Sequence, residues 1–174
     1  VSNKWVYTDF EKIYYFNKAG HYLTNQWVHN SDDNIWRYAK NDGTQANEEW
    51  LKMSDGQWYY FDVSGIMAAN GWHNTQLKDG KWKKYYFDKD GHYLIDHWAY
   101  DSNGKTWSYA KHDGTQANEE WLKMSDGHWY YFNIIGIMPT NSFLGTNLGN
   151  GKWQTYYFDK DGHYLTNAWA YDAY

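Results

Sequence analysis

The stretch WYYFDVSGIMAANGW, residues 58–72, sets the pattern that the rest of the chain repeats. Its central glycine is Gly65, with Tyr60 five residues before it and Trp72 seven residues after it. A tyrosine five residues before and an aromatic residue seven after recur around six further glycines: Gly20, Gly43, Gly91, Gly114, Gly136 and Gly162. The sequence therefore predicts seven copies of one small structural unit.

The seven glycines follow a longer period as well. Their spacings are 23, 22, 26, 23, 22 and 26 residues, which gives a superperiod of 71 residues. Residues 44–61 and 115–132, one superperiod apart, differ only at Gln57 and His128. Such recurring units are typical of solenoids, in which a unit buries its apolar face only by stacking on its neighbours. We therefore predict that residues 1–174 form a single repeat module.

Each unit is predicted to be a β-hairpin centred on its glycine. Alternate side chains of residues 58–61 point to opposite faces, as in a strand. Residues 62–65 are typical of a turn, because Gly65 can adopt a positive φ angle that a side chain opposes. Residues 66–72 are then expected to run back as the second strand. The predicted fold class is all-β, a repetitive solenoid of about seven stacked β-hairpins.

Composition narrows the classes of function. Aromatic residues make up 22% of the 174 residues, so we expect an aromatic-lined structure rather than a thick aliphatic core. The chain has no cysteine, which excludes disulfides and thiolate metal sites. A net charge of −5 without a basic run argues against nucleic acid or membrane as partners. No apolar run is long enough for a spanning helix, and Val1 does not begin a signal peptide, so we expect a mature or excised piece of a longer protein.

The motif resembles a known repeat. The pattern G-x-W-Y-Y-F-x-x-x-G-x-M-x-x-x-G-W, residues 56–72, resembles the cell-wall-binding repeat of choline-binding modules on Gram-positive surface proteins and phage endolysins. It is similar also to the glucan-binding repeats of glucansucrases and to the C-terminal repeats of clostridial toxins. The resemblance implies a superhelix with about three hairpins per turn and with ligands held between consecutive hairpins.

The resemblance also implies aromatic boxes for the ligand. In the choline-binding family a box holds the Trp that opens a hairpin, the Trp that closes it and a Tyr of the next hairpin. Ring faces attract a quaternary ammonium by cation–π interaction. The candidate boxes are Trp36, Trp50 and Tyr60; Trp58, Trp72 and Tyr86; Trp107, Trp121 and Tyr131; and Trp129 with Tyr157, where Phe143 replaces the closing Trp.

Two alternatives stay open for these rings. The tyrosine five residues before each glycine is expected to belong to the stacking core rather than to a ligand site. The tryptophans could instead stack on pyranose sugars, with Gln45, Asn47, Gln116 and Asn118 taking the hydroxyls. Hairpins that lie 71 residues apart are expected to stack above one another, which gives three columns of hairpins. In the third column the position of the opening Trp holds Ile13, Lys84 and Thr155, so we expect no choline there.

No motif predicts catalysis, a metal or a cofactor. Asp88–Gly91 and Asp159–Gly162 only faintly resemble a calcium loop, because no bidentate Glu follows at the required distance. The neighbouring carboxylates of Glu48 and Glu49 point to opposite faces of a strand, which does not suit a glycosidase pair. We therefore predict that the chain is not an enzyme, although its parent could be a wall hydrolase or a glucansucrase.

The leading hypothesis is a secreted, cell-wall-associated targeting module. Its predicted partner is a cell-wall polymer, either choline-decorated teichoic acid or another wall glycan. The first alternative is an α-glucan-binding module of a glucansucrase-like parent. The second is a ligand-free structural spacer. Homodimer formation is left open.

Overall fold

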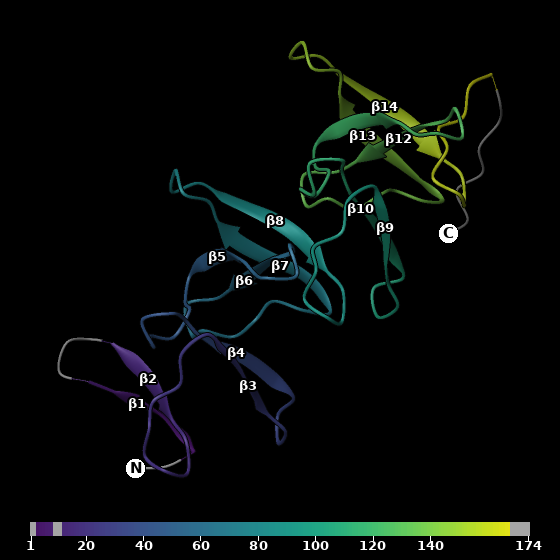
Figure 1. The fold of residues 1–174 in the computed structure, drawn as a ribbon. Helices are drawn as coiled ribbons and strands as arrows, with labels where there is room; N and C mark the ends of the chain where they lie inside the picture. Colours follow the sequence, from purple (N-terminus) through teal and green to yellow (C-terminus); the bar gives the residue numbers. More distant parts are fainter. Residues whose placement is uncertain (1–2, 9–11, 168–174) are drawn as a thin grey trace. The chain divides into compact units, whose positions relative to one another are not determined.

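The computed structural model describes residues 3–8 and 12–167, and these residues form an all-β structure. Fourteen strands pair into seven antiparallel two-stranded sheets, each a hairpin of consecutive strands (Figure 1). The predicted all-β fold of seven hairpins is confirmed. The described part of the chain has no helix long and apolar enough to cross a membrane.

The hairpins follow one another along the chain. Their bounds are β1 Lys4–Tyr7 with β2 Ile13–Phe16, β3 Gln26–Asn30 with β4 Ile35–Ala39, β5 Glu49–Lys52 with β6 Trp58–Phe61, β7 Gly71–Gln76 with β8 Trp82–Phe87, β9 His97–Asp101 with β10 Thr106–Ala110, β11 Glu120–Lys123 with β12 Trp129–Phe132, and β13 Ser142–Asn147 with β14 Trp153–Phe158.

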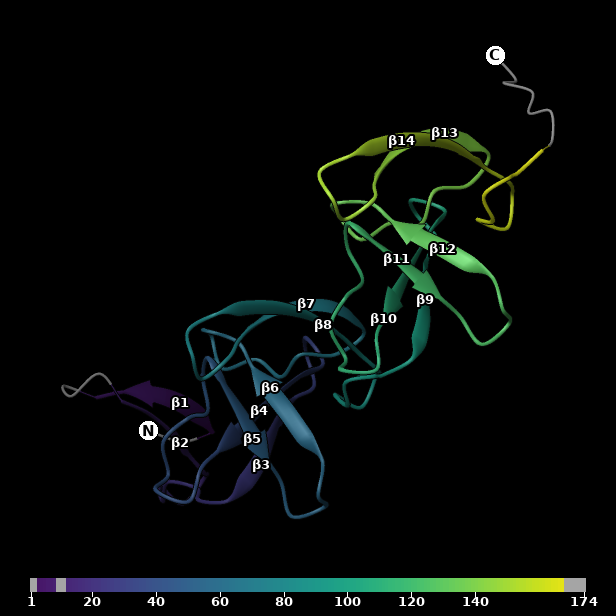
Figure 2. The same ribbon diagram turned by 90° about the horizontal axis from the view of Figure 1, so that it is seen from above.

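The chain divides into two compact units, residues 1–94 and 95–174. Hairpins β3–β4 and β5–β6 of the first unit lie next to each other in both views of the ribbon (Figure 2). The second unit repeats the same frame one superperiod later, with hairpins β9–β10 and β11–β12. That the seven repeats act as one module stays a prediction.

The hairpins are out of phase with those predicted from the sequence. The turn at Gly56 closes β5–β6, whereas hairpins centred on Gly65 and its equivalents would place this turn between two hairpins. The turn at Gly65, predicted to be the centre of a hairpin, is the connector. Both turns have the same local hydrogen bonds: the N–H of Gly56 donates to Met53 at 3.0 Å, and that of Gly65 donates to Asp62 at 2.8 Å. Turn chemistry alone therefore did not distinguish them.

Contacts with the preceding hairpin decide the phase. After the turn at Gly65, only Met67 pairs back, as a single bridge to Phe61. The N–H of Met67 instead donates to the carbonyl of Trp36 on β4, at 2.9 Å. The next N–H, of Ala68, donates to Tyr60. The segment that we expected to be a second strand thus connects one hairpin to the one before it.

A residue with a left-handed backbone conformation, that is a positive φ angle, comes before each new hairpin. It stands five positions after each of the seven repeat glycines, which we call the frame glycines. In the six repeats that a described hairpin follows, its N–H donates to the residue directly after the second strand of that hairpin, as Asn70 does to Asp88 at 2.9 Å. Side chains oppose positive φ, and Asn and Asp oppose it least. The seven residues are Asn25, Glu48, Asn70, Asp96, Glu119, Asn141 and Asn167, with φ angles between 46° and 56°.

The core is thin and aromatic. Phe61, Phe87, Phe132 and Phe158 are fully buried, and Tyr60 and Tyr131 are 2% exposed. The hydroxyl of Tyr60 accepts a hydrogen bond from the N–H of Gln76 at 3.2 Å. The expectation that the tyrosine five residues before each glycine belongs to the core is confirmed for these two residues.

The frame glycines are also the points where repeats touch. A Cβ placed on Gly65 would lie 2.8 Å from the carbonyl oxygen of Ala46 and would overlap the side chain of Gln45. Gly43, Gly91, Gly136 and Gly162 likewise contact a side chain two residues after the preceding frame glycine. Glycine is therefore required there for close approach as well as for its φ angle of 71°.

This double role gives a matched pair of variants. Gly65→Ala should lower the free energy of unfolding by about 3 kcal/mol, because strain at positive φ adds to the overlap with Gln45 and Ala46. Gly56→Ala should lower it by only about 1 kcal/mol, because its φ is also positive but nothing lies within 4 Å of the new Cβ. Urea unfolding of both variants measures the difference. Equal losses would contradict the stacking role of Gly65.

Candidate functional site

The clearest candidate site is an aromatic pocket on hairpin β3–β4. Its ring walls are Trp27 of β3, Trp36 of β4 and Tyr59 of β6, and the side chain of Met67 lies beside them. Trp27 lies 6.2 Å from Trp36 with an interplanar angle of 86°, and 5.1 Å from Tyr59 at 69°. The pocket has a volume of about 240 Å³. We call it the Trp36 cage.

Strand alternation places these walls. On β6, Tyr59 and Phe61 point to one face and Tyr60 to the other. The first face packs on the preceding hairpin, where Trp27 contacts both Tyr59 and Phe61. The second face packs within its own hairpin, where Tyr60 is the cross-strand partner of Trp50. Tyr59 is therefore the residue that reaches the cage.

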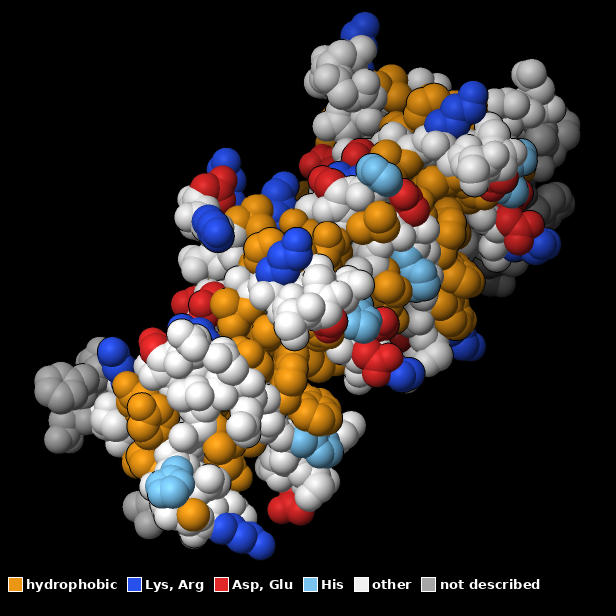
Figure 3. All heavy atoms as spheres, viewed as in Figure 1, with side chains coloured by type: hydrophobic (Ala, Val, Ile, Leu, Met, Phe, Trp, Pro, Cys, Tyr) orange, Lys and Arg blue, Asp and Glu red, His pale blue; other side chains and the backbone are white. Residues whose placement is uncertain are grey.

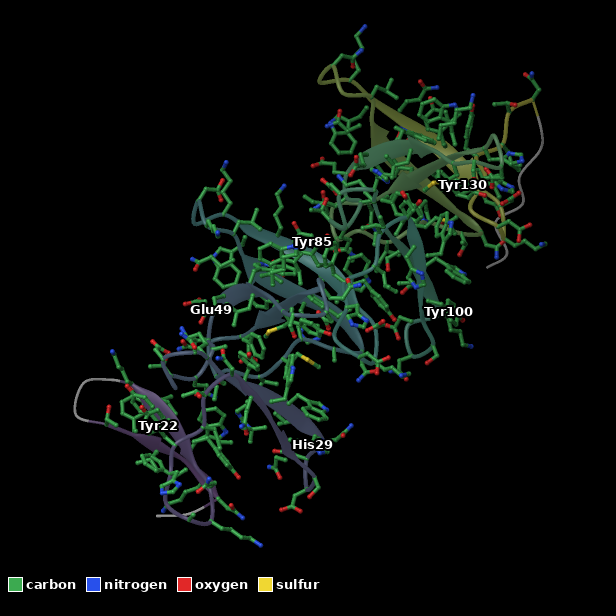
Figure 4. The ribbon with its side chains drawn as sticks, viewed as in Figure 1. Tyr22, His29, Glu49, Tyr85, Tyr100 and Tyr130 are labelled. Carbon is green, nitrogen blue, oxygen red and sulfur yellow. The ribbon has the colours of Figure 1, made fainter. Side chains whose placement is uncertain are left out.

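The second unit contains the same site. The Trp107 cage is lined by Trp98, Trp107, Tyr130 and Met138, each one superperiod after its counterpart, and its volume is about 330 Å³. Trp98 lies 6.3 Å from Trp107 and 5.2 Å from Tyr130. Trp36 and Trp107 are each 39% exposed, so one ring of each cage is accessible to a ligand. Tyr130 on β12 is marked in Figure 4.

Both cages have a charged rim. Lys89 and Asp90 line the Trp36 cage, and Lys160 and Asp161 line the Trp107 cage. The Lys89 ammonium lies 2.6 Å from the Asp90 carboxylate, and the two side chains are 78% and 57% exposed. An exposed pair like this contributes little stability. Both charged groups are therefore available to a ligand.

A different cage occurs on hairpin β11–β12. The Trp129 cage is lined by Trp121, Trp129, Tyr156, Tyr164 and Leu148, with a volume of about 240 Å³. Trp121 lies 5.3 Å from Tyr156 and 5.4 Å from Tyr164. None of the described residues that line it is charged.

The first unit has the matching rings on β5–β6. Trp50 lies 5.2 Å from Tyr85 and 5.7 Å from Tyr93, and Trp58 is 38% exposed. By its correspondence to the Trp129 cage one superperiod later, we call this set of rings the Trp58 cage; Tyr85 on β8 is marked in Figure 4. The space-filling view shows hydrophobic side chains at the surface of both units, interspersed with charged ones (Figure 3).

In each cage the exposed tryptophan stands seven residues before a frame glycine, which is the opening position. The remaining hairpins have no tryptophan at this position, as the sequence indicated. They have Ile13, Lys84 and Thr155 there, on β2, β8 and β14. The Lys84 ammonium lies 5.9 Å from the ring centre of Trp72. The chain thus places its own cation over this tryptophan, which suits the expectation that this column holds no cationic ligand.

The predicted boxes do not form as grouped. Each proposed pair of closing Trp and following Tyr consists of cross-strand neighbours within one hairpin: Trp50 with Tyr60, Trp72 with Tyr86, Trp121 with Tyr131, and Phe143 with Tyr157. The opening tryptophans Trp36, Trp58, Trp107 and Trp129 are cage walls, but with other partners. Trp50 belongs to the Trp58 cage, and Trp121 belongs to the Trp129 cage. In both cases the exposed tryptophan opens the second strand of the same hairpin.

The cage residues that sequence reasoning missed share a signal. The walls Tyr59, Tyr85, Tyr130 and Tyr156 stand six residues before a frame glycine, where the other repeats have Tyr14, Arg37 and Ser108. The position five before is tyrosine in every repeat. A position that is aromatic only in some repeats is the better candidate for a ligand contact, because the common core does not require it.

A hydrogen-bonded chain supports the tyrosine wall of each charged cage. The Tyr59 hydroxyl donates to Asp55 at 2.8 Å and lies 2.9 Å from Nε2 of His92. Burial and the bond to Asp55 raise the pKa of Tyr59 to about 12. The N–H of Gln57 and the Tyr59 hydroxyl lower the pKa of Asp55. Asp55 is therefore an acceptor at neutral pH.

The acidic groups in the same region serve the fold. Glu49 pairs with Lys40 at 2.9 Å, and Glu120 with Lys111 at 3.0 Å, so both glutamates have a cationic partner. Asp159, Asp161 and His163 each place one atom within 4.8 Å of the others. Asp159 accepts backbone hydrogen bonds that close its turn, and Asp161 pairs with Lys160. These contacts are those of a hydrogen-bonded turn.

The repeats match a known family model. Residues 48–67 and 119–138 match the model described as "Putative cell wall binding repeat". Each segment begins at a left-handed Glu and ends at the Met of a charged cage.

Related proteins carry similar repeats. The chain is 34% identical over 100 residues to glucosyltransferase-S of Streptococcus mutans, a match that covers 58% of this chain and 6% of that protein. Choline binding protein F of Streptococcus pneumoniae is 26% identical, with a TM-score of 0.61, over 95% of this chain and 48% of that one.

The modular autolysin LytC of Streptococcus pneumoniae is also 26% identical, with a TM-score of 0.54, over 95% of this chain and 43% of that one. This chain therefore spans less than half of each of these proteins. The chain thus carries repeats of the choline-binding, cell wall binding repeat family, to which the repeats of glucansucrases are related.

Proposed function

We propose that this chain is a non-catalytic targeting module that binds choline groups on a cell-wall polymer through its four aromatic cages. The observation that carries the proposal is the pair of matching pockets at Trp36 and Trp107. Each surrounds a space of a few hundred Å³ with steeply inclined rings and carries a Lys–Asp ion pair at the rim. A quaternary ammonium has no proton to donate, so ring faces and a nearby negative charge are the groups that attract it.

The relatives support this ligand. One solved relative is named a choline binding protein, and another was solved with a synthetic peptidoglycan ligand. Membership of a cell wall binding family indicates association with the cell surface. We propose that the parent protein is secreted and that the wall polymer is the partner of this module. Whether it forms a homodimer stays open.

Several cages on one chain suit a polymeric ligand. A single exposed cation–π contact is worth about 0.5–1 kcal/mol, so each cage alone is expected to bind choline weakly. A polymer that engages cages in succession gains avidity, because each later contact is intramolecular. The four cages thus supply attachment without a single tight site.

The second candidate is α-glucan binding. It is favoured by the 34% identity to glucosyltransferase-S and by the exposed indoles, whose faces could stack on pyranose rings. The inclined ring faces of the cages favour choline instead, because such faces attract a quaternary ammonium. The ligand-free spacer is the least favoured, because stacking alone does not require open ring pockets.

Choline should stabilise the chain. Because choline is expected to bind only the folded cages, a concentration of 100 times Kd should raise the free energy of unfolding by about 2.7 kcal/mol for each independent site. The melting temperature should therefore rise with choline concentration, and tryptophan fluorescence should change in parallel. If choline has no effect while dextran retards the protein in an affinity gel, the glucan candidate replaces this one.

The cage walls should carry the binding. Trp36→Ala and Trp107→Ala together should weaken choline binding at the charged cages between about two-fold and thirty-fold, the range for one lost cation–π wall. Titration calorimetry measures the change. Trp82→Ala with Trp153→Ala is the matched control, because these tryptophans are 55% and 62% exposed and line none of the cages described. Equal losses from both pairs would contradict the cage assignment.

A further inference from the structure

The tip of hairpin β7–β8 carries a cluster of lysines. Residues 78–84 hold one acidic residue, Asp79, and four lysines: Lys78, Lys81, Lys83 and Lys84. Their net charge is +3, whereas that of the whole chain is −5. Figure 3 shows Lys side chains projecting where Figure 1 places the turn between β7 and β8. We call residues 78–84 the basic tip; the charge of the whole chain does not describe this surface.

Part of this positive charge has no acidic partner within the hairpin. The Lys81 ammonium pairs with Asp79 at 2.9 Å, and the two side chains are 73% and 53% exposed. Hydrogen bonds from Lys81 lower the pKa of Asp79, and the nearby charge of Lys83 adds to this effect. Lys78 and Lys83 are exposed, and no ion pair among the described residues includes either of them. Their ammonium groups are therefore available to an anion.

The second unit forms the same hairpin without the cluster. Strands β13 and β14 have 6 residues each, as β7 and β8 do. The turns close alike, because the N–H of Lys81 donates to Asp79 at 3.1 Å and that of Lys152 donates to Asn150 at 3.0 Å. At the other three lysine positions the second unit has Gly149, Gln154 and Thr155. The hairpin thus does not need the lysines in order to form.

The kind of basic residue indicates the kind of anion. An ammonium group is a compact point charge with three donors, which suits the oxygens of a phosphate from any direction. A planar carboxylate is matched better by the fork of an arginine, and residues 78–84 contain none. A small anion would meet only part of the cluster, whereas a chain of phosphates can contact several lysines at once. The cluster therefore fits a phosphate-bearing polymer.

The basic tip also lies next to an aromatic cage. Leu148 lines the Trp129 cage, and its counterpart one superperiod earlier, Leu77, directly precedes the basic tip. By this correspondence the tip begins beside the Trp58 cage. A polymer that carries both quaternary ammonium and phosphate groups can thus contact the cage and the tip together.

We propose that the basic tip binds the phosphate groups of an anionic polymer. The site goes beyond the proposed function, because it takes a different chemical group and requires no choline. Since attraction between exposed charges is screened by dissolved ions, binding should weaken as salt is added.

The test measures binding of inorganic polyphosphate to the full chain by titration calorimetry at low ionic strength. Polyphosphate has no quaternary ammonium, so it does not report on the aromatic cages. Lys78→Gln with Lys83→Gln should weaken its binding roughly twenty-fold, about five-fold for each lysine, which is the gain expected of a lysine near an anionic surface. Free choline should bind this variant as it binds the unmodified chain.

A matched control removes the same charge elsewhere. Lys18 and Lys105 are exposed and lie in other turns. Lys18→Gln with Lys105→Gln changes the net charge equally but leaves the cluster intact, so polyphosphate binding should weaken less than about two-fold.

The second unit allows the reverse experiment. Gln154→Lys with Thr155→Lys places lysines at the positions that correspond to Lys83 and Lys84. Gln154 and Thr155 are exposed, so the hairpin should accept both changes. A second polyphosphate site should then appear in the titration.

Four results would overturn the proposal. The first two are absence of polyphosphate binding at low ionic strength and equal losses from the tip and control pairs. The third is binding to anionic lipid vesicles without binding to polyphosphate, which would assign the tip to a membrane surface. The fourth is tighter binding of a single-stranded oligonucleotide of equal charge, whose bases can stack on Trp82, because this would assign the tip to nucleic acid. Choline binding is measured separately, so the proposed function stands or fails by its own result.

Discussion

Packing of each cage tryptophan on the rings of the next hairpin is the interaction on which this structure depends. Trp27 lies on a two-stranded hairpin, which alone would be at most marginally stable. Its ring contacts Tyr38 within the hairpin at 5.1 Å, and Tyr59 and Phe61 of the next hairpin at 5.1 and 5.7 Å. Trp98 makes the same three contacts in the second unit, with Tyr109, Tyr130 and Phe132. The hairpins are therefore stable as neighbours rather than singly.

The same packing creates the cage. An inclined ring such as Tyr59 leaves an open angle beside Trp27, and Trp36 forms the other side of that angle while remaining partly exposed. The ring that stabilises the stack is thus also a wall of the ligand site. A ligand in this angle would contact two hairpins at once, so binding and stacking should favour each other. This explains how a thin chain without an aliphatic core can offer pockets without losing its structure.

Much of the fold could be read from the sequence, and the reason is repetition. The frame around Gly65 predicted the all-β class, seven hairpins and the burial of Tyr60. It did not predict which of two similar turns closes a hairpin, because the turns at Gly56 and Gly65 have the same local hydrogen bonds. Only the bond from Met67 to Trp36 of the preceding hairpin distinguishes them. That contact joins residues 31 positions apart, and no local pattern reports it.

The site residues that were missed differ from the predicted ones by one position on the strand. The predicted boxes took Tyr60 and its equivalents from the resemblance to the choline-binding family. In the structure Tyr59, its neighbour on β6, faces the preceding hairpin instead, and its hydroxyl contacts Asp55 and His92. A shift by one residue on a strand exchanges its two faces. The location of the candidate site, at the opening tryptophans of two columns of repeats, was thus predicted. The tyrosine walls and their hydrogen-bond partners were not predicted, because they depend on the register between hairpins.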